Sequence, residues 1–287
     1  MTNMDLDKRL FAYRDDIANI ELKGKVTSKE FLEGEKYQVA TGISRLFAIP
    51  DANTPLVSQL LYGEYFFVFE INDGWAWGQS VKDGYVGYCS LNSLTLDLHE
   101  TTHHVSAVSS HIYPEPNLKT QPVDMLHMMS DVSIIDEAQT NGFLPLADGN
   151  WVYATHISKD YGKDPVSEAL KFLYTPYLWG GRSNAGIDCS GLIQIAYASV
   201  GIAVPRDADL QEAELGMQLK EDKVPEYGDL AFFPGHVGIM LDDMHLLHAN
   251  AHHMRVSIDP LRDVIDIVSF QTEKPPLSSI KRISLNL

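Results

Sequence analysis

Short runs of alternating apolar and polar residues fill the first half of the chain, and the pattern changes after Pro165. Between residues 41 and 157, β-branched and aromatic runs are cut by Gly, Asn and Asp, which is typical of small β-barrels. Helical spacing follows at 166–174 and again from Cys189 to about Val200. Alternating strands are expected from about Asp229 to Ile283. A helical half followed by a strand half predicts an α+β domain.

The barrel region contains an imperfect internal repeat. Its matched positions are 64 to 68 residues apart: Pro50 with Pro114, Glu70 with Glu137, Gly74 with Gly142, and Asp83 with Asp148. We interpret the repeat as two tandem barrels at 41–97 and 98–157; one larger β-domain with chance similarity is the alternative. Residues 1–40 form a polar leader, and residues 158–287 form the last domain. Four apolar leader positions are expected to pack on a neighbouring domain: Leu10, Phe11, Tyr13 and Ile17.

Charge and composition exclude several classes of partner. The chain has 287 residues, of which 45% are hydrophobic, an ordinary globular balance. With 22 basic and 39 acidic residues the net charge is 22 − 39 = −17, which disfavours nucleic acid and anionic membranes as partners. We find no run of eighteen apolar residues and no signal-peptide pattern. Only two cysteines are present, as expected in a reducing compartment, so a cytoplasmic location is predicted.

Cys189 begins the second expected helix, with Asp188 as its N-cap. A helix N-terminus carries about half a positive charge, which stabilises a thiolate and is expected to lower the pKa of the thiol. A thiolate is the nucleophile that acyl transfer needs. The alternative interpretation is a buried structural cysteine.

Two histidines flank the turn signal at Asp242-Asp243. A hairpin folded about Asp242 places His236 opposite His248, because 236 + 248 = 2 × 242. His236 is then the candidate base, and His248 orients it. A metal site is the rival hypothesis, built from these two histidines and Cys189 with His245 or His252. The spacing lacks the close ligand pairs of metal motifs.

Five stretches resemble, in order, the NlpC-type cell-wall cysteine peptidases, which have a papain-like fold. They are Pro176–Gly181, Gly186–Leu192, Val204–Asp207 with Gln211, Gly228–Phe233 and Gly235–Ile239. The two upstream repeats resemble bacterial SH3-type domains. Together these features resemble the cytoplasmic γ-D-glutamyl-L-diamino-acid endopeptidases that recycle murein peptides. The resemblance implies that the substrate is L-Ala-γ-D-Glu-diamino acid, with meso-diaminopimelate or lysine in the last position, and that no cofactor or metal takes part.

The resemblance also implies residue roles. Cys189 attacks the amide carbonyl on the γ-carboxyl side of D-Glu, His236 transfers the proton, and His248 is the third catalytic residue. The Cys189 N–H and the Tyr177 hydroxyl stabilise the oxyanion.

The implied ligands of the free L-Ala amine are Glu64, Tyr85 and Asp188, with Ser190 close by and Tyr88 as the alternative to Tyr85. Ala208 stands where relatives carry a hydroxyl residue, which puts one substrate contact in doubt. Trp179, Gly180 and Gly181 are expected to shape the turn beside the site, and Arg206 to pin a loop.

Three other functions stay open at this stage. The first is a hydrolase of intact peptidoglycan that grips the wall with its SH3-type domains. The second is an amidase or acyltransferase on the same scaffold. The third is a ligand-binding protein without catalysis, which the presence of both Cys189 and His236 disfavours.

Overall fold

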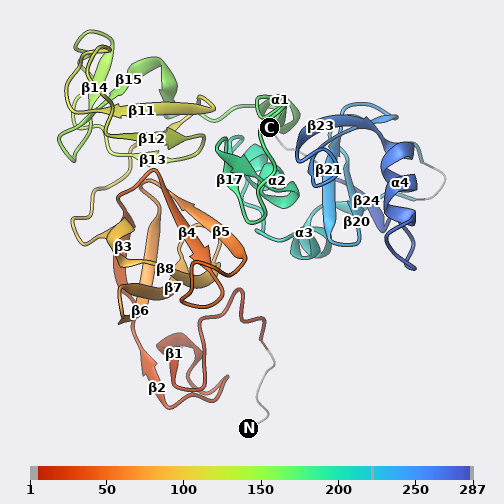
Figure 1. Ribbon diagram of the computed structural model, residues 1–287, viewed down its shortest axis with the longest axis horizontal. Coiled ribbons are helices and arrows are strands. Elements are labelled where there is room, and N and C mark those ends of the chain that lie inside the picture. The colour runs from red at the N-terminus through yellow and green to blue at the C-terminus, as the bar shows by residue number, and fades with distance from the viewer. Residues whose placement is uncertain (1–5, 221–222, 285–287) are drawn as a thin grey trace. The chain divides into compact units, whose positions relative to one another are not determined.

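A computed structural model describes residues 6–220 and 223–284 (Figure 1). The chain divides into two compact units, Met1–Lys159 and Asp160–Leu287. The first unit consists of strands and short 3-10 helices, and the second combines helices with an antiparallel sheet.

The N-terminal segment is folded. Strand β1 (Ile17–Asn19) pairs in parallel with β2 (Glu30–Leu32), and the 3-10 helix η1 (Ile20–Leu22) lies between them. Ala18, Leu22 and Val26 form a small core of their own. As expected, two of the apolar leader positions pack on the following barrel: Leu10 on its main core, and Ile17 beside Phe69 and Trp77.

The first barrel is a seven-stranded sheet in the order β5-β4-β8-β7-β6-β3-β9. Its elements are β3 (Glu35–Val39), β4 (Ile43–Phe47), β5 (Leu56–Leu61), β6 (Tyr65–Asn72), β7 (Trp75–Ser80), β8 (Val86–Ser90), η2 (Leu91–Ser93) and β9 (Leu94–Thr95). The sheet therefore begins at Glu35, before the predicted boundary at residue 41. The turn between β6 and β7 has Asp73 and Gly74 at positive φ, which a two-residue hairpin turn requires.

The second barrel repeats this order with shorter strands. Its elements are β10 (His103–Val105), β11 (Ser109–Tyr113), β12 (Asp124–His127), β13 (Asp131–Val132), β14 (Phe143–Pro145), β15 (Trp151–Tyr153), η3 (Ala154–His156) and β16 (Ile157–Ser158). The sheets β12-β11-β15-β14 and β13-β10-β16 reproduce β5-β4-β8-β7 and β6-β3-β9 strand for strand. The sequence repeat is therefore a repeat of topology.

The second unit is built on a six-stranded sheet in the order β19-β24-β20-β21-β22-β23. Its strands are β19 (Met217–Gln218), β20 (Leu230–Phe233), β21 (His236–Met240), β22 (His245–Asn250), β23 (Arg255–Pro260) and β24 (Ser279–Arg282). A separate hairpin pairs β17 (Arg182–Ser183) with β18 (Gly186–Ile187). The helix α2 (Cys189–Ala198) is buried along its length and packs on β21 and β22. This packing brings the start of α2 to the strand that carries His236.

The other helices differ from the sequence-based expectation. Helix α1 (Pro165–Leu170) is capped by Asp164 and is shorter than the predicted 166–174. Helix α3 (Ala208–Glu214) was not predicted. Helix α4 (Leu261–Ser269) lies where only strands were expected, so that prediction is wrong. Leu261, Val264, Ile265 and Val268 recur at helical spacing, and this face of α4 packs against the sheet core.

Candidate active site

The nucleophile predicted from the sequence is the first residue of α2. Its thiol accepts a hydrogen bond from the backbone N–H of Val237, so it lies next to the backbone of His236. Burial and the nearby charge of Asp188 raise the pKa of Cys189 to about 12. The expectation of a lowered pKa is therefore wrong, because burial outweighs the helix N-terminus. The resting thiol is neutral, and a base must remove its proton.

His236 and His248 meet as predicted, but in a different strand register. The pairs Ile239 with Leu247 and Met240 with Leu246 each sum to 486, so the hairpin is centred on residue 243 and not on Asp242. Extended along β21, this register places His236 opposite Asn250. His248 is then a diagonal neighbour, within reach of a long side chain. The two rings are joined by a 2.8 Å hydrogen bond between His236 Nε2 and His248 Nδ1.

A carboxylate completes a relay that the sequence did not reveal. His248 Nε2 lies 2.9 Å from Asp259 Oδ2, and the Ser257 hydroxyl donates to the same oxygen at 2.6 Å. A carboxylate only accepts, so His248 carries its proton on Nε2 and leaves Nδ1 bare. His236 must then donate from Nε2, which leaves its Nδ1 unprotonated. Nδ1 of His236 is thus the atom that can take the thiol proton.

Burial shapes the charge of this relay. Burial, helped by His248, lowers the pKa of His236 to about 3. Burial also lowers the pKa of His248, and its hydrogen bond to Asp259 offsets part of that effect. The imidazoles of His236 and His248 are therefore both neutral near pH 7 in the resting protein. Charges appear together when the proton moves from Cys189 to His236, with the imidazolium stabilised through His248 by Asp259.

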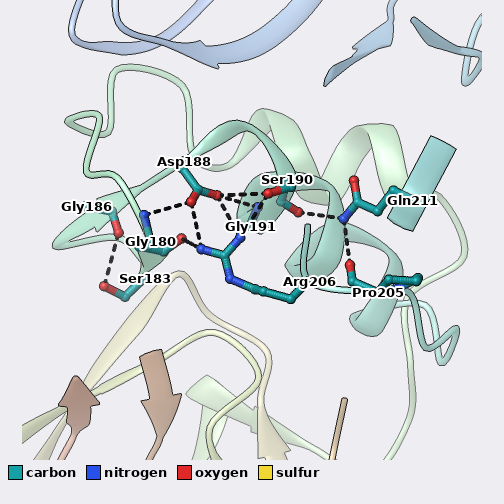
Figure 2. A network of polar contacts seen from close by, with 10 residues as sticks. Gly180, Ser183, Gly186, Asp188, Ser190, Gly191, Pro205, Arg206 and Gln211 are labelled. Carbon is teal, nitrogen blue, oxygen red and sulfur yellow. Dashed lines mark hydrogen bonds and ion pairs between the residues drawn. The ribbon is translucent and has the colours of Figure 1, made fainter. Parts of the chain in front are cut away.

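Asp188 is the centre of a buried polar network at the start of α2 (Figure 2). Its carboxylate accepts five hydrogen bonds: from Gly180 N–H, Gly191 N–H, the Ser190 hydroxyl and both terminal nitrogens of Arg206. The Arg206 side chain is 1% exposed, and its Nη2 lies 2.7 Å from Asp188 Oδ2. Arg206 thus pins the loop that carries the nucleophile, as expected. The ammonium of a substrate would have to replace one of these donors at Asp188.

Ser190 and Tyr177 lie near the nucleophile. The Ser190 hydroxyl accepts from Arg206 Nη1 at 2.9 Å, and its carbonyl accepts from Gln211 Nε2 at 2.9 Å, so this residue belongs to the Asp188 network (Figure 2). Tyr177 forms a β-bridge with Ile187, two residues before Cys189. Burial, together with the neighbouring ionisable groups of Cys189 and Asp188, raises the pKa of Tyr177. Its hydroxyl therefore keeps its proton as a donor, and its role at the oxyanion stays a prediction.

The remaining predicted ligands belong to the first unit. Tyr85 is buried in the main core of the first barrel. Glu64 is buried as well; its Oε2 accepts the Leu61 N–H at 3.0 Å, and its Oε1 lies 3.6 Å from Lys82 Nζ. Tyr88, the alternative to Tyr85, accepts a hydrogen bond from Arg14 Nη1 at 2.6 Å and packs on Trp77. The substrate-binding roles of Glu64 and Tyr85 stay predictions.

The metal-site hypothesis is not supported by the structure. In residues 6–220 and 223–284, no three His, Cys, Asp or Glu side chains are grouped so that they could hold an ion. His245, one of the extra ligands considered, pairs with Asp242 at 2.8 Å. The His pair is instead bordered by a cavity of about 530 Å³, which Tyr177 and Trp179 also line.

Two parts of the chain match known protein families. Residues 174–266 match the NlpC/P60 family, and residues 46–94 match the bacterial dipeptidyl-peptidase SH3 domain. Dipeptidyl-peptidase 6 of Lysinibacillus sphaericus is 29% identical over 245 residues, which cover 76% of this chain and 89% of that protein. The γ-D-glutamyl-L-lysine dipeptidyl-peptidase of Bacillus subtilis (strain 168) is 34% identical over 123 residues, covering 39% of this chain and 40% of that protein.

A solved structure has the same fold. The crystal structure of an NlpC/P60 family protein from Bacillus cereus ATCC 10987 has a TM-score of 0.72 at 19% identity, covering 86% of this chain and 99% of that one. The predicted α+β peptidase fold with an SH3-like β-domain is thereby confirmed. Residues 174–266 thus form a cysteine peptidase domain of the NlpC/P60 family, which follows a bacterial SH3 domain along the chain, and the chain is homologous to dipeptidyl-peptidase 6 and the γ-D-glutamyl-L-lysine dipeptidyl-peptidases.

Proposed function

We propose that this cysteine peptidase hydrolyses the amide between γ-D-Glu and a diamino acid in free murein peptides that begin with an unblocked L-Ala. The observation that carries the proposal is the relay of Asp259, His248 and His236 beside the buried thiol of Cys189. The γ-D-glutamyl bond is supported as the one cleaved by two relatives that are γ-D-glutamyl-L-lysine dipeptidyl-peptidases.

The geometry supports a two-step acyl transfer. His236 Nδ1 takes the thiol proton as the sulfur attacks the carbonyl carbon of γ-D-Glu. The Cys189 backbone N–H and the Tyr177 hydroxyl stabilise the oxyanion. The imidazolium of His236 then protonates the leaving nitrogen, the amide bond breaks, and a thioester remains. Water gives a proton to His236 and its oxygen to the carbonyl, which releases the acid and restores the thiol.

Recognition of the free amine is the second part of the proposal. The carboxylate of Asp188 already accepts five hydrogen bonds, so in this proposal its main task is to hold the start of α2 through Arg206. Glu64 and Tyr85, both buried in the first barrel, stay the proposed ligands of the L-Ala ammonium together with Asp188. Such recognition would spare peptides whose L-Ala is still linked to muramic acid.

A cytoplasmic role in cell-wall peptide recycling completes the proposal. Cys89 and Cys189 are both unpaired thiols, which suits a reducing compartment. Within the described parts of the chain, no helix combines the length and apolarity needed to cross a membrane.

The test is incubation with L-Ala-γ-D-Glu-L-Lys and L-Ala-γ-D-Glu-meso-diaminopimelate, followed by mass analysis. We expect the dipeptide L-Ala-γ-D-Glu and the free diamino acid, and no products with Cys189→Ala. Intact peptidoglycan and an amine acceptor are assayed in parallel. Release of fragments from intact wall, or transfer to the amine in place of hydrolysis, would replace the proposal by one of the alternative functions.

A further inference from the structure

The cavity beside the catalytic histidines has a definite position in the reaction. His236 and His248 line one side of it, and Cys189 is not among its lining residues. The cavity therefore lies on the histidine side of the Cys189–His236 pair. Its volume of about 530 Å³ is large enough for an amino-acid side chain.

Helix α4 supplies the opposite wall. Asp263, Ile267 and Gln271 line the cavity at intervals of four residues, which places them along one stripe of the helix and its C-terminal extension. Leu261 and Ile265, in contrast, pack against the sheet core. Ile267 is half-buried and lies outside that core cluster, so it offers apolar surface to the cavity. Val264 and Val268 also line the cavity, at the border where the helix packs on the sheet core.

A carboxylate stands at the same wall without a protein cation beside it. Asp263 is exposed, and among the described residues no hydrogen-bond donor or ion-pair partner contacts its side chain. Asp259 on the neighbouring strand differs, since His248, His253 and Ser257 all contact its oxygens. Asp263 is thus the carboxylate of this cavity that a cationic ligand group can pair with.

The chemistry of the leaving group connects these observations. His236 must lie within hydrogen-bond reach of the leaving nitrogen, because it delivers the proton there. The residue that contributes this nitrogen is therefore held on the histidine side, where the cavity opens. We propose that the cavity binds the side chain of this residue, with an alkyl stem against Ile267 and a terminal ammonium at Asp263. This inference rests on the proposed function, whose diamino acid carries such a side chain.

Two matched peptides test the inference. L-Ala-γ-D-Glu-L-norleucine keeps the four-carbon side chain of the lysine peptide but lacks its ammonium. We expect kcat/KM to be about two- to fivefold higher for the lysine peptide, the range of a solvent-exposed ion pair. Asp263→Asn should bring this ratio close to one. Asp266→Asn is the control: it removes the same charge from the same helix at an exposed position outside the cavity lining, and should leave the ratio as in the wild type.

The outcomes separate the two proposals. Equal kcat/KM for both peptides in the wild type would overturn the role of the cavity and leave the proposed function standing. The same holds if Asp263→Asn and Asp266→Asn lower the ratio equally, because the effect would then belong to the general field of the protein. Cleavage of neither peptide would overturn the proposed function and this inference with it.

Discussion

The nucleophile and its base are held in place by different physical means. Cys189 stands at the end of a buried helix that an ion pair fixes, with Arg206 and Asp188 almost closed to solvent. His236 lies on the sheet in a chain of hydrogen bonds that ends at Asp259, beside an open cavity. The first arrangement couples the site to the stability of the fold. The second couples it to proton transfer and to substrate. Substitutions in the first region should therefore lower stability, and substitutions in the second should lower the catalytic rate.

The largest expected effect is the loss of the thiol. Cys189→Ala should lower kcat/KM by at least about 10⁴-fold, because no other group forms the thioester. The fold should remain, since the Asp188 cap is unchanged, and the midpoint of urea unfolding checks this. Iodoacetamide should inactivate the wild type, and EDTA should not. Activity that survives iodoacetamide and is lost in EDTA would favour the metal hypothesis.

Within the relay, the loss should decrease with distance from the thiol. His236→Ala should lower kcat by about 10²- to 10⁴-fold, the usual contribution of a general acid–base. His248→Ala should cost less, at most about 10²-fold, because it removes only the orientation of His236. Steady-state kinetics of both variants at several pH values measure the difference. An equal or larger loss at His248 would mean that the two roles are reversed.

Substitutions around the nucleophile should chiefly lower the free energy of unfolding. Arg206→Met leaves the carboxylate of Asp188 buried without its cation, which should lower the free energy of unfolding by about 3–5 kcal/mol. Lys159→Met is the matched control, since its ion pair with Glu137 is exposed on both sides, and should cost far less. Urea denaturation compares the two. Similar losses would show that the buried pair does not hold the fold.

The smallest expected effect concerns pH. The pKa of His236 is lowered to about 3 in the folded protein, from the ordinary value near 6.5. Between these values the unfolded chain binds a proton that the native state does not, so stability falls as pH falls below 6.5. His236→Asn should make this slope shallower between pH 6.5 and 5, above the range in which carboxylates titrate. Thermal unfolding across that window measures it, and an unchanged slope would contradict the account.

The sequence predicts the nucleophile side better than the base side. The cap at Asp188 and the helical spacing after Cys189 are local signals, and α2 begins where they indicate. The register of the histidine strands depends on turn geometry, and the observed centre of the hairpin is residue 243, one residue beyond the predicted Asp242.

Two features near the catalytic base, Asp259 and helix α4, have only weak signals in the sequence. Asp259 lies on a third strand, where only the alternation of Ser257 and Asp259 on one face gives a hint. Helix α4 is rich in β-branched residues, which favour strands, and its packing against the sheet decides its form.

The most direct test compares the free tripeptide L-Ala-γ-D-Glu-L-Lys with its N-acetylated form on the wild-type enzyme. A charge-assisted contact to the free ammonium should raise kcat/KM by about tenfold to a hundredfold over the blocked peptide. Glu64→Gln should narrow that advantage, chiefly through KM. A ratio near one for the wild type would rule out recognition of the amine and contradict the proposed role in peptide recycling.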